Sequence, residues 1–244
     1  ETTSLSVEEK KEVINFIIEK NKRRLPLVLG IGGNNTDKVI KEILSTDLSS
    51  FAAILSVTPY YNKPSQEGLY SHYKEISQAS PIPIILYNVP SRTGVNMSAN
   101  ITLRLANNFS NIIAIKEASG DLKQINQILD EKPASFNVLS GDDALTLEMI
   151  NSGASGVISV IGQSHPQEFS DMVSAGLDND KLKANKIHND LFGLYHFLYS
   201  EGNPSGIKAL LSLMDLCENN LRLPLVPISN SLHNEFKQYI NGLH

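Results

Sequence analysis

The chain has little of several features that would mark a specialised class of protein. Its 244 residues include no tryptophan and one cysteine, so no intramolecular disulfide framework can form. Basic residues number 21 against 26 acidic ones, a net charge of -5, and this excludes the overall positive field that nucleic acid or an anionic membrane requires. No apolar run approaches the ~20 residues that span a bilayer, and no signal peptide is visible. We therefore expect a cytoplasmic protein with no nucleic acid or membrane partner.

The residues that usually hold metals or perform redox chemistry are also sparse. The single cysteine, Cys217, falls in a run with helical spacing over 210–217, where we expect it to fill the core. The six histidines show no ligand spacing, and Asp143 is explained as a helix cap. The glycines of 30–35 lack the last glycine of a dinucleotide fingerprint and predict a tight turn. We expect neither a metal nor an organic cofactor.

Short apolar runs recur along the first two thirds of the chain, and segments with helical spacing separate them. The predicted strands are 25–30, 53–58, 84–88, 112–116, 137–140 and 156–160. Residues typical of helix N-caps precede the helical segments: Ser6 with Glu9, Thr36, Ser65, Ser98, Asp121 and Asp143. This alternation predicts a parallel sheet, and strands that are apolar throughout indicate that both faces are covered.

Six strands fit either an open doubly wound sheet or most of an eight-stranded barrel. Distinctive polar groups follow five of the six strands, and a barrel gathers such groups at one mouth, so we favour the barrel. We predict an α/β TIM (β/α)8 barrel lacking its first two strands, because the chain opens at Glu1 directly before a helix. We place the barrel, strands 3 to 8, at 1–176 and a C-terminal helical region at 177–244. Helices are expected over 166–176, 179–199, 204–217 and 229–242.

Two strand-end residues can carry carbonyl chemistry. Lys116 ends an apolar strand, where loss of solvation lowers a lysine pKa and frees the neutral amine for a Schiff base. Tyr87 ends the preceding strand, where a phenol can transfer protons to and from such an imine. By position alone, a lysine that leaves a strand for solvent is the more common interpretation of Lys116, and Tyr87 can equally be an aromatic residue that packs the barrel top.

Further polar and aromatic residues follow neighbouring strands. Arg92 offers a planar fork that can hold a carboxylate by two hydrogen bonds, although most arginines at such positions are surface residues. Tyr60 and Tyr61 lie in a proline-flanked loop, and paired tyrosines of this kind are also typical of subunit contacts.

Several long motifs occur together in this chain: Thr-Pro-Tyr-Tyr-Asn-Lys-Pro-Ser-Gln-Glu-Gly at 58–68, Tyr-Asn-Val-Pro-Ser-Arg-Thr-Gly at 87–94, Ile-Lys-Glu-Ala at 115–118, Ser-Gly-Asp-Asp at 140–143 and Gly-Val-Ile-Ser-Val at 156–160. In this order they closely resemble the dihydrodipicolinate synthase family of pyruvate-dependent class I lyases, which includes N-acetylneuraminate lyase. The resemblance covers nearly the whole chain. It implies condensation of pyruvate with L-aspartate 4-semialdehyde to 4-hydroxy-tetrahydrodipicolinate, in the diaminopimelate route of lysine biosynthesis, without a cofactor.

The resemblance also implies a role for individual residues. Lys116 would form the imine with pyruvate, Tyr87 would donate and accept protons, and Tyr61 would complete a proton relay in a neighbouring subunit's site. Arg92 would bind the semialdehyde carboxylate, while the backbone near Gly141 and Ile158 would shape the pyruvate pocket. The family further implies a homotetramer built as a dimer of dimers.

Two departures from the family pattern alter what we expect. The family carries Gly-Thr-Thr-Gly-Glu at the end of its second strand, and this chain opens at what resembles the Glu, so we expect an incomplete barrel and severely impaired activity for this chain alone. The family's lysine effector site lies near the first helix, Asn34 and Tyr60. The matching positions here are Val7, Lys10 and Lys38, and added cations repel a cationic ligand. We expect weak or absent inhibition by lysine.

Two alternatives stay open. A sister lyase that acts on sialic acid or a keto-deoxy sugar acid would share the lysine and tyrosine, but such members lack an arginine matching Arg92. A non-catalytic barrel kept for assembly or ligand sensing is the other, because the relay threonines are missing.

Overall fold

The computed structural model describes residues 1–242, which form two compact units. One comprises Phe16–Ile158, and the other joins Glu1–Asn15 with Ser159–His244. Helix α1 (Val7–Asn21) runs from one unit into the other. The predicted boundary, between residues 176 and 177, divides the chain differently. That boundary stays a prediction. Within residues 1–242, no helix combines the length and apolar character needed to cross a membrane.

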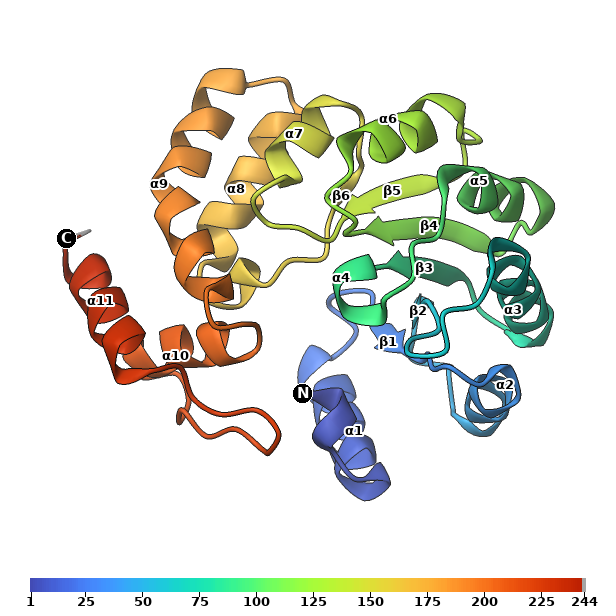
Figure 1. Ribbon diagram of the computed structural model, residues 1–244, viewed down its shortest axis with the longest axis horizontal. Coiled ribbons are helices and arrows are strands. Elements are labelled where there is room, and N and C mark those ends of the chain that lie inside the picture. Colours follow the sequence, from blue (N-terminus) through green and yellow to red (C-terminus); the bar gives the residue numbers. More distant parts are fainter. Residues whose placement is uncertain (243–244) are drawn as a thin grey trace. The chain divides into compact units, whose positions relative to one another are not determined.

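The unit Phe16–Ile158 is built on a six-stranded parallel sheet whose spatial order follows the chain (Figure 1). The strands are β1 (Val28–Gly30), β2 (Ala53–Val57), β3 (Ile84–Asn88), β4 (Ile112–Glu117), β5 (Asn137–Ser140) and β6 (Gly156–Val157). All six predicted strands are confirmed, but the first and last are shorter than expected. Pairing with β2 begins only at Val28, after Pro26, and pairing with β5 ends at Val157.

Helices separate the strands, and most of them cover one side of the curled sheet. They are α2 (Thr36–Ser45), α3 (Gln66–Ala79), α4 (Pro90–Thr93), α5 (Ala99–Asn108), α6 (Leu122–Glu131) and α7 (Thr146–Asn151). Figure 1 shows α2, α3, α5 and α6 following one another along this side. The strand residues that face these helices are completely buried: Ile54, Leu86, Ile115 and Val138. Alternate residues form the other face, where Ala53, Ile85 and Ala114 pack together. The expected parallel α/β architecture is therefore confirmed, while the two preceding barrel strands stay a prediction.

Most of the predicted helix starts are confirmed by hydrogen bonds. The side chains of Ser65, Ser98 and Asp121 each accept a backbone N–H from the first turn of their helix. Ser6 and Glu9 form a capping box: the Glu9 N–H donates to Ser6 Oγ at 3.1 Å, and the Ser6 N–H donates to Glu9 Oε2 at 2.8 Å.

Two predicted caps are wrong by one or two positions. Asn35, not Thr36, caps α2, because its side chain accepts the Lys38 N–H. Leu145, not Asp143, is the N-cap residue of α7, because a turn closed by Asp142 comes first. In that turn the Asp142 carboxylate accepts the N–H groups of Ala144 and Leu145.

The other unit contains the C-terminal helices. These are α8 (Pro166–Leu177), α9 (Lys181–Tyr199), α10 (Ser205–Leu213) and α11 (Asn230–Asn241), with short 3-10 turns η1 (Thr2–Ser4) and η2 (Ile161–Gln163). All four predicted helices are confirmed, but the third ends at Leu213 rather than 217. The backbone turns there, with Asp215 in the left-handed region at a φ of 57°. Cys217 is consequently exposed, and its expected place in the core is wrong.

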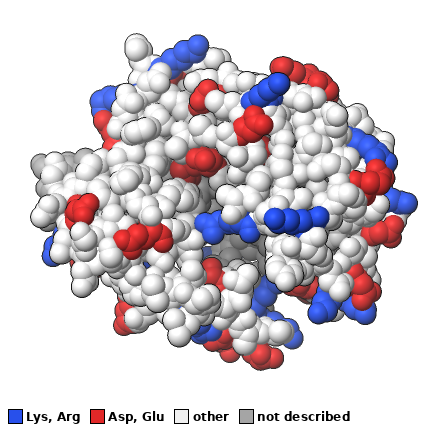
Figure 2. Space-filling view, viewed as in Figure 1, with Lys and Arg blue, Asp and Glu red and all other residues white. Residues whose placement is uncertain are grey.

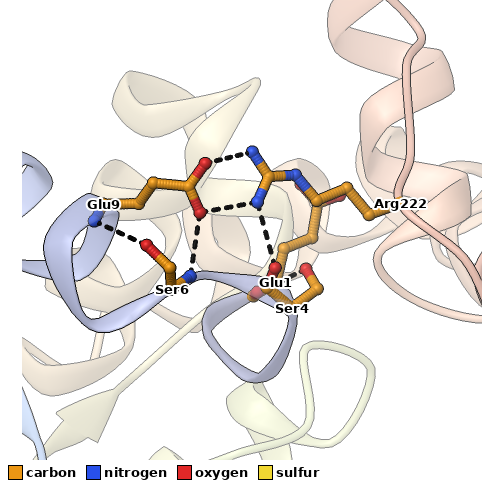
Figure 3. Close-up of polar contacts among 5 residues, drawn as sticks. All are labelled: Glu1, Ser4, Ser6, Glu9 and Arg222. Atoms are coloured by element: carbon orange, nitrogen blue, oxygen red, sulfur yellow. Dashed lines mark hydrogen bonds and ion pairs between the residues drawn. The ribbon is translucent and has the colours of Figure 1, made fainter.

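Charged side chains fasten the N-terminal residues within this unit (Figure 3). Arg222 donates two hydrogen bonds of 2.6 Å to the Glu9 carboxylate and a third, of 3.1 Å, to the Ser4 carbonyl. Lys208 forms a 2.7 Å ion pair with Glu1. Together these contacts tie the N-terminal segment to α10 and to the loop that contains Arg222.

Candidate active site

The strands β3 and β4 bring Tyr87 and Lys116 side by side. These residues are direct neighbours in the parallel register, at the carboxyl ends of their strands. Alternation along each strand places Tyr87 on the same face as Ile85, and Lys116 on the same face as Ala114. That face is only partly filled, since Leu55, Ile113 and Leu139 are partly buried on it. Both polar side chains therefore stand at one end of an apolar, half-covered surface.

The Lys116 amine has the surroundings that a nucleophilic lysine needs. Its Nζ lies 4.3 Å from the centroid of the Tyr87 ring, over the ring face. Burial lowers the pKa of the amine to about 8, and the positive charge of Arg92 acts in the same direction. The Asp143 carboxylate opposes this shift but does not cancel it. The uncharged fraction of the amine near neutral pH is therefore larger than that of an ordinary lysine.

Tyr87 is held in its protonated form by the same surroundings. Burial raises the pKa of the phenol, and the charge of Arg92 partly offsets this. The Tyr87 carbonyl accepts the Thr58 N–H at 2.9 Å, which joins the ends of β2 and β3. A protonated phenol beside a neutral amine can donate a proton to a substrate bound at that amine.

Arg92 comes from α4, the short helix that directly follows β3. Gly94 ends this helix at a φ of 77°, in the left-handed conformation that favours glycine. The Arg92 side chain is exposed, yet its charge affects the pKa of both Lys116 and Tyr87. The structure therefore brings Arg92 into the electrostatic range of both residues.

Gly141 touches Lys116 directly. Its N–H donates to the Glu117 carbonyl at 2.8 Å, and a Cβ at this position would lie 3.1 Å from Lys116 Cε and 2.7 Å from Ala118 Cβ. No side chain fits here without displacing these neighbours. Ile158 is half-buried at the end of β6, and its N–H donates to the Ser140 carbonyl at 2.9 Å. The predicted pocket residues Gly141 and Ile158 thus both adjoin the end of β5.

Tyr61 is separate from this cluster. Its side chain is 89% exposed, and its backbone has a φ of 74°, a strained conformation for an aromatic residue. The neighbouring Tyr60 carbonyl accepts a 3.2 Å hydrogen bond from Asn34 Nδ2. The predicted effector residues Asn34 and Tyr60 therefore lie together, whereas the Tyr61 side chain points into solvent in this single chain.

A buried polar network lies behind Tyr87 and Lys116, and sequence reasoning missed it. Asn88 and Glu117 follow those two residues in their strands, are completely buried, and face the helices. Glu117 accepts hydrogen bonds from Asn88 Nδ2 at 3.1 Å, the Ser119 N–H at 2.7 Å and Gln124 Nε2 at 3.3 Å. The sequence does contain a signal for this network. Side chains alternate along a strand, so the carboxylate that follows Lys116 must face the helices. A carboxylate buried there requires hydrogen-bond donors.

Residues 1–242 contain no group of three or more histidine, cysteine, aspartate or glutamate side chains placed to hold a metal ion. Acidic and basic side chains are interspersed on the face shown in Figure 2.

Comparison with known proteins agrees with this arrangement. The model of the dihydrodipicolinate synthetase family matches residues 1–243. The chain belongs to this family. A 4-hydroxy-tetrahydrodipicolinate synthase of Azobacteroides pseudotrichonymphae is 51% identical over 238 residues, which cover 98% of this chain and 80% of that protein. The family resemblance drawn from the motifs is confirmed.

Solved structures of the dihydrodipicolinate synthetase family have the same fold. Dihydrodipicolinate synthase from Aquifex aeolicus superposes with a TM-score of 0.95 at 37% identity, covering 99% of this chain and 82% of that one. The chloride-inhibited enzyme from Acinetobacter baumannii, solved as a complex with pyruvate, gives a TM-score of 0.94 at 37% identity and covers 100% and 83%.

Proposed function

We propose that this chain condenses pyruvate with L-aspartate 4-semialdehyde through an imine on Lys116, to give 4-hydroxy-tetrahydrodipicolinate in the diaminopimelate route of lysine biosynthesis. The observation that carries this proposal is the Lys116 amine, with a pKa lowered to about 8, lying 4.3 Å from the Tyr87 ring centroid. Membership of the dihydrodipicolinate synthetase family supports the choice of reaction.

The chemistry starts with the neutral Lys116 amine attacking the ketone carbon of pyruvate. The resulting carbinolamine loses water as Tyr87 supplies a proton to the leaving oxygen, and an imine forms. Loss of a methyl proton gives an enamine, whose carbon attacks the aldehyde carbon of the second substrate. The substrate amine then displaces Lys116 by transimination, which closes the ring and frees the enzyme.

Arg92 sets the preference for the second substrate in this proposal. Its guanidinium can hold the semialdehyde carboxylate by two hydrogen bonds, whereas sialic acid and keto-deoxy sugar acids present a hydroxylated chain at this end. The backbone at Gly141 and Ile158 would bound the pyruvate pocket, because both residues adjoin the end of β5. Metal ions and organic cofactors have no step in this scheme.

Trapping with borohydride tests the imine. The protein is incubated with pyruvate, reduced, digested and examined by peptide mass spectrometry. We expect the adduct on Lys116, and none in Lys116→Arg, which keeps the charge but has no nucleophilic amine at neutral pH. An adduct on another lysine, or none, would contradict the proposal.

Turnover with L-aspartate 4-semialdehyde against N-acetylneuraminate then separates the synthase from a sister lyase, and pyruvate binding without turnover would indicate a non-catalytic barrel.

We include in the proposal a homotetramer, built as a dimer of dimers, in which Tyr61 serves a neighbouring subunit's site. The exposed side chain and strained backbone of Tyr61 support this role. Mixing Tyr61→Phe chains with Lys116→Arg chains tests it. Mixed oligomers that contain a site with both native residues should recover activity that neither variant has alone. No recovery in oligomers shown to be mixed would exclude an intersubunit role.

The proposal also covers the complete barrel. We infer an eight-stranded barrel over 1–176 with strands 3 to 8 in this sheet, and a helical region over 177–244. Within the described residues β1 pairs only with β2, and β6 only with β5, so both sheet edges can accept further strands. A protein extended at its N-terminus by the corresponding segment of a relative should turn over much faster than this chain, and equal turnover would contradict this inference.

Weak or absent inhibition by lysine and a cytoplasmic location complete the proposal. Lys38 would repel a cationic effector near Asn34 and Tyr60. Turnover of the extended protein should fall by less than about twofold at ~1 mM lysine. Clear inhibition below that concentration would refute this part.

A further inference from the structure

The pairing of β3 with β4 contains an irregularity that bears on the position of Lys116. Ile84 pairs with Ile112, but the next residue, Ile85, pairs with Ala114, so Ile113 is an extra residue in β4. In a strand, a shift by one residue moves every following side chain to the opposite face. The register after this bulge therefore decides whether Lys116 faces Tyr87 or the helices.

The residues that can fix this register form the last pair of the two strands. Asn88 pairs with Glu117 in the position next to the Tyr87 and Lys116 pair, and both point to the helix side. Asn88 Nδ2 donates to both carboxylate oxygens of Glu117, at 3.2 and 3.1 Å. Both side chains have no exposed surface, and a shift of β4 by one residue would move the Glu117 carboxylate to the other face, away from Asn88, Ser119 and Gln124, which donate to it here.

We infer that Asn88 and Glu117 form a register clamp that positions the Lys116 amine over the Tyr87 ring, a role whose importance for catalysis rests on the proposed function. The clamp is anchored on both sides. Asn88 Oδ1 accepts the Met97 N–H at 2.9 Å, and Glu117 Oε1 accepts the Ser119 N–H at 2.7 Å. Gln124 ties the carboxylate to α6 with a 3.3 Å hydrogen bond. Asn88 and Glu117 are positioning residues, because their side chains face away from the amine.

The position of Lys116 can be followed without any substrate. Because Nζ lies 4.3 Å from the ring centroid, the ring current of Tyr87 shifts the NMR signal of the Lys116 ε-methylene protons upfield. Asn88→Asp keeps the shape of the side chain and the acceptor for Met97, but turns its donor into an acceptor that faces Glu117 and also Asn96 Oδ1, to which the Asn88 amide donates at 2.8 Å. We expect the upfield signal to be lost in this variant, and weakened in Glu117→Gln.

The double variant with both substitutions provides the decisive comparison. An amide at 117 can donate to a carboxylate at 88. The pair is restored with its hydrogen bond reversed when the amides of Asn96 and Gln124, which bond the same atoms and each other, rotate to exchange donor and acceptor. We expect the upfield signal to return in the double variant. A folded Asn88→Asp protein that keeps the wild-type signal would overturn the clamp, and so would a double variant no better than the worse single one.

Asn111→Asp is the matched control. Asn111 lies just before β4, where its Nδ2 donates to the Ser77 carbonyl at 2.8 Å and its Oδ1 accepts from Ser77 Oγ at 2.6 Å. The same substitution there should lower thermal stability without moving the Lys116 signal. If both single variants at the clamp unfold while this control folds, the network is a requirement of the fold rather than a positioning device, and the inference fails.

The rate of the borohydride-trapped adduct links the clamp to the reaction. At saturating pyruvate, we expect the rate of adduct formation to fall on the order of 10- to 100-fold in Asn88→Asp, with less change in the half-saturating pyruvate concentration. The rate should recover in the double variant. If wild-type protein forms no adduct while the NMR signal behaves as expected, the proposed function fails and the clamp stands. If the adduct forms at the wild-type rate in the variants, the clamp fails and the proposed function stands.

Discussion

Lys116 and Arg222 are both cations held among neighbouring side chains, but their surroundings differ in kind. Arg222 is exposed and meets the Glu9 carboxylate through two short hydrogen bonds, which lower the pKa of Glu9 to about 2. Lys116 is half-buried over an aromatic ring, and burial lowers its own pKa to about 8. The first arrangement favours the charged forms and fastens a segment. The second shifts the equilibrium toward the neutral amine, the form that the proposed imine chemistry requires.

The two cations differ in their exposure to solvent and in the groups that they contact. An exposed pair keeps its hydration and contributes little to stability unless its geometry is bidentate, as it is for Arg222. A cation moved away from water beside an apolar sheet face loses hydration that the Asp143 carboxylate only partly replaces. Three predictions test this contrast, from the largest expected effect to the smallest.

Substitution of Gly141 should disturb the Lys116 environment most. In Gly141→Ala the new Cβ would lie 3.1 Å from Lys116 Cε and 2.7 Å from Ala118 Cβ, so the amine must move. We expect the rate of adduct formation with pyruvate to fall on the order of 10²-fold, because small displacements of a reacting group have effects of this size. Gly156→Ala is the control, since its Cβ would meet only Leu139 Cδ2, at an ordinary 3.6 Å. Equal rates in the two variants would show that the close approach at Gly141 is unimportant.

The pH dependence of adduct formation should report the lowered pKa of Lys116. Only the neutral amine attacks, so the rate should rise with pH to a midpoint near 8, whereas an ordinary lysine would reach it near 10.5. Below the midpoint the rate should change about tenfold per pH unit. Arg92→Leu removes a charge that lowers this pKa, and should move the midpoint upward. Arg104→Leu, which breaks the exposed pair with Glu67, should leave the midpoint in place. A midpoint near 10.5 in the native protein would show that the amine is fully hydrated.

The Glu9 and Arg222 pair should affect stability alone, and by the smallest amount. The pKa of Glu9 is lowered from 4.5 to about 2 in the folded protein, so its contribution to stability is complete above pH 4.5 and is lost as the pH falls toward 2. Arg222→Gln should therefore reduce the difference in unfolding temperature between pH 5 and pH 3, and Lys186→Gln, at another exposed pair, controls for the loss of a surface cation. An unchanged pH dependence in Arg222→Gln would show that the pair does not stabilise the folded chain.

Much of the fold follows from local patterns. Apolar runs and helical spacing located all six strands of the sheet and the four C-terminal helices, because burial of one element against another requires these periodicities. The predicted helix boundaries are wrong where a turn competes with a helix. Asp142 rather than Asp143 closes the turn before α7, and the left-handed Asp215 follows the end of α10 before Cys217 is reached. Such choices depend on which backbone groups find partners after folding.

The candidate site divides in the same way. The amino-acid sequence determined that Tyr87 and Lys116 each end a strand, since the apolar pattern of one strand is a local property. Only the tertiary structure decided that a bulge at Ile113 and the buried pair of Asn88 and Glu117 accompany that placement. It also decided that Gly141 touches the lysine side chain. Register and close contact arise between segments far apart in the chain, where no periodicity within one segment can specify them.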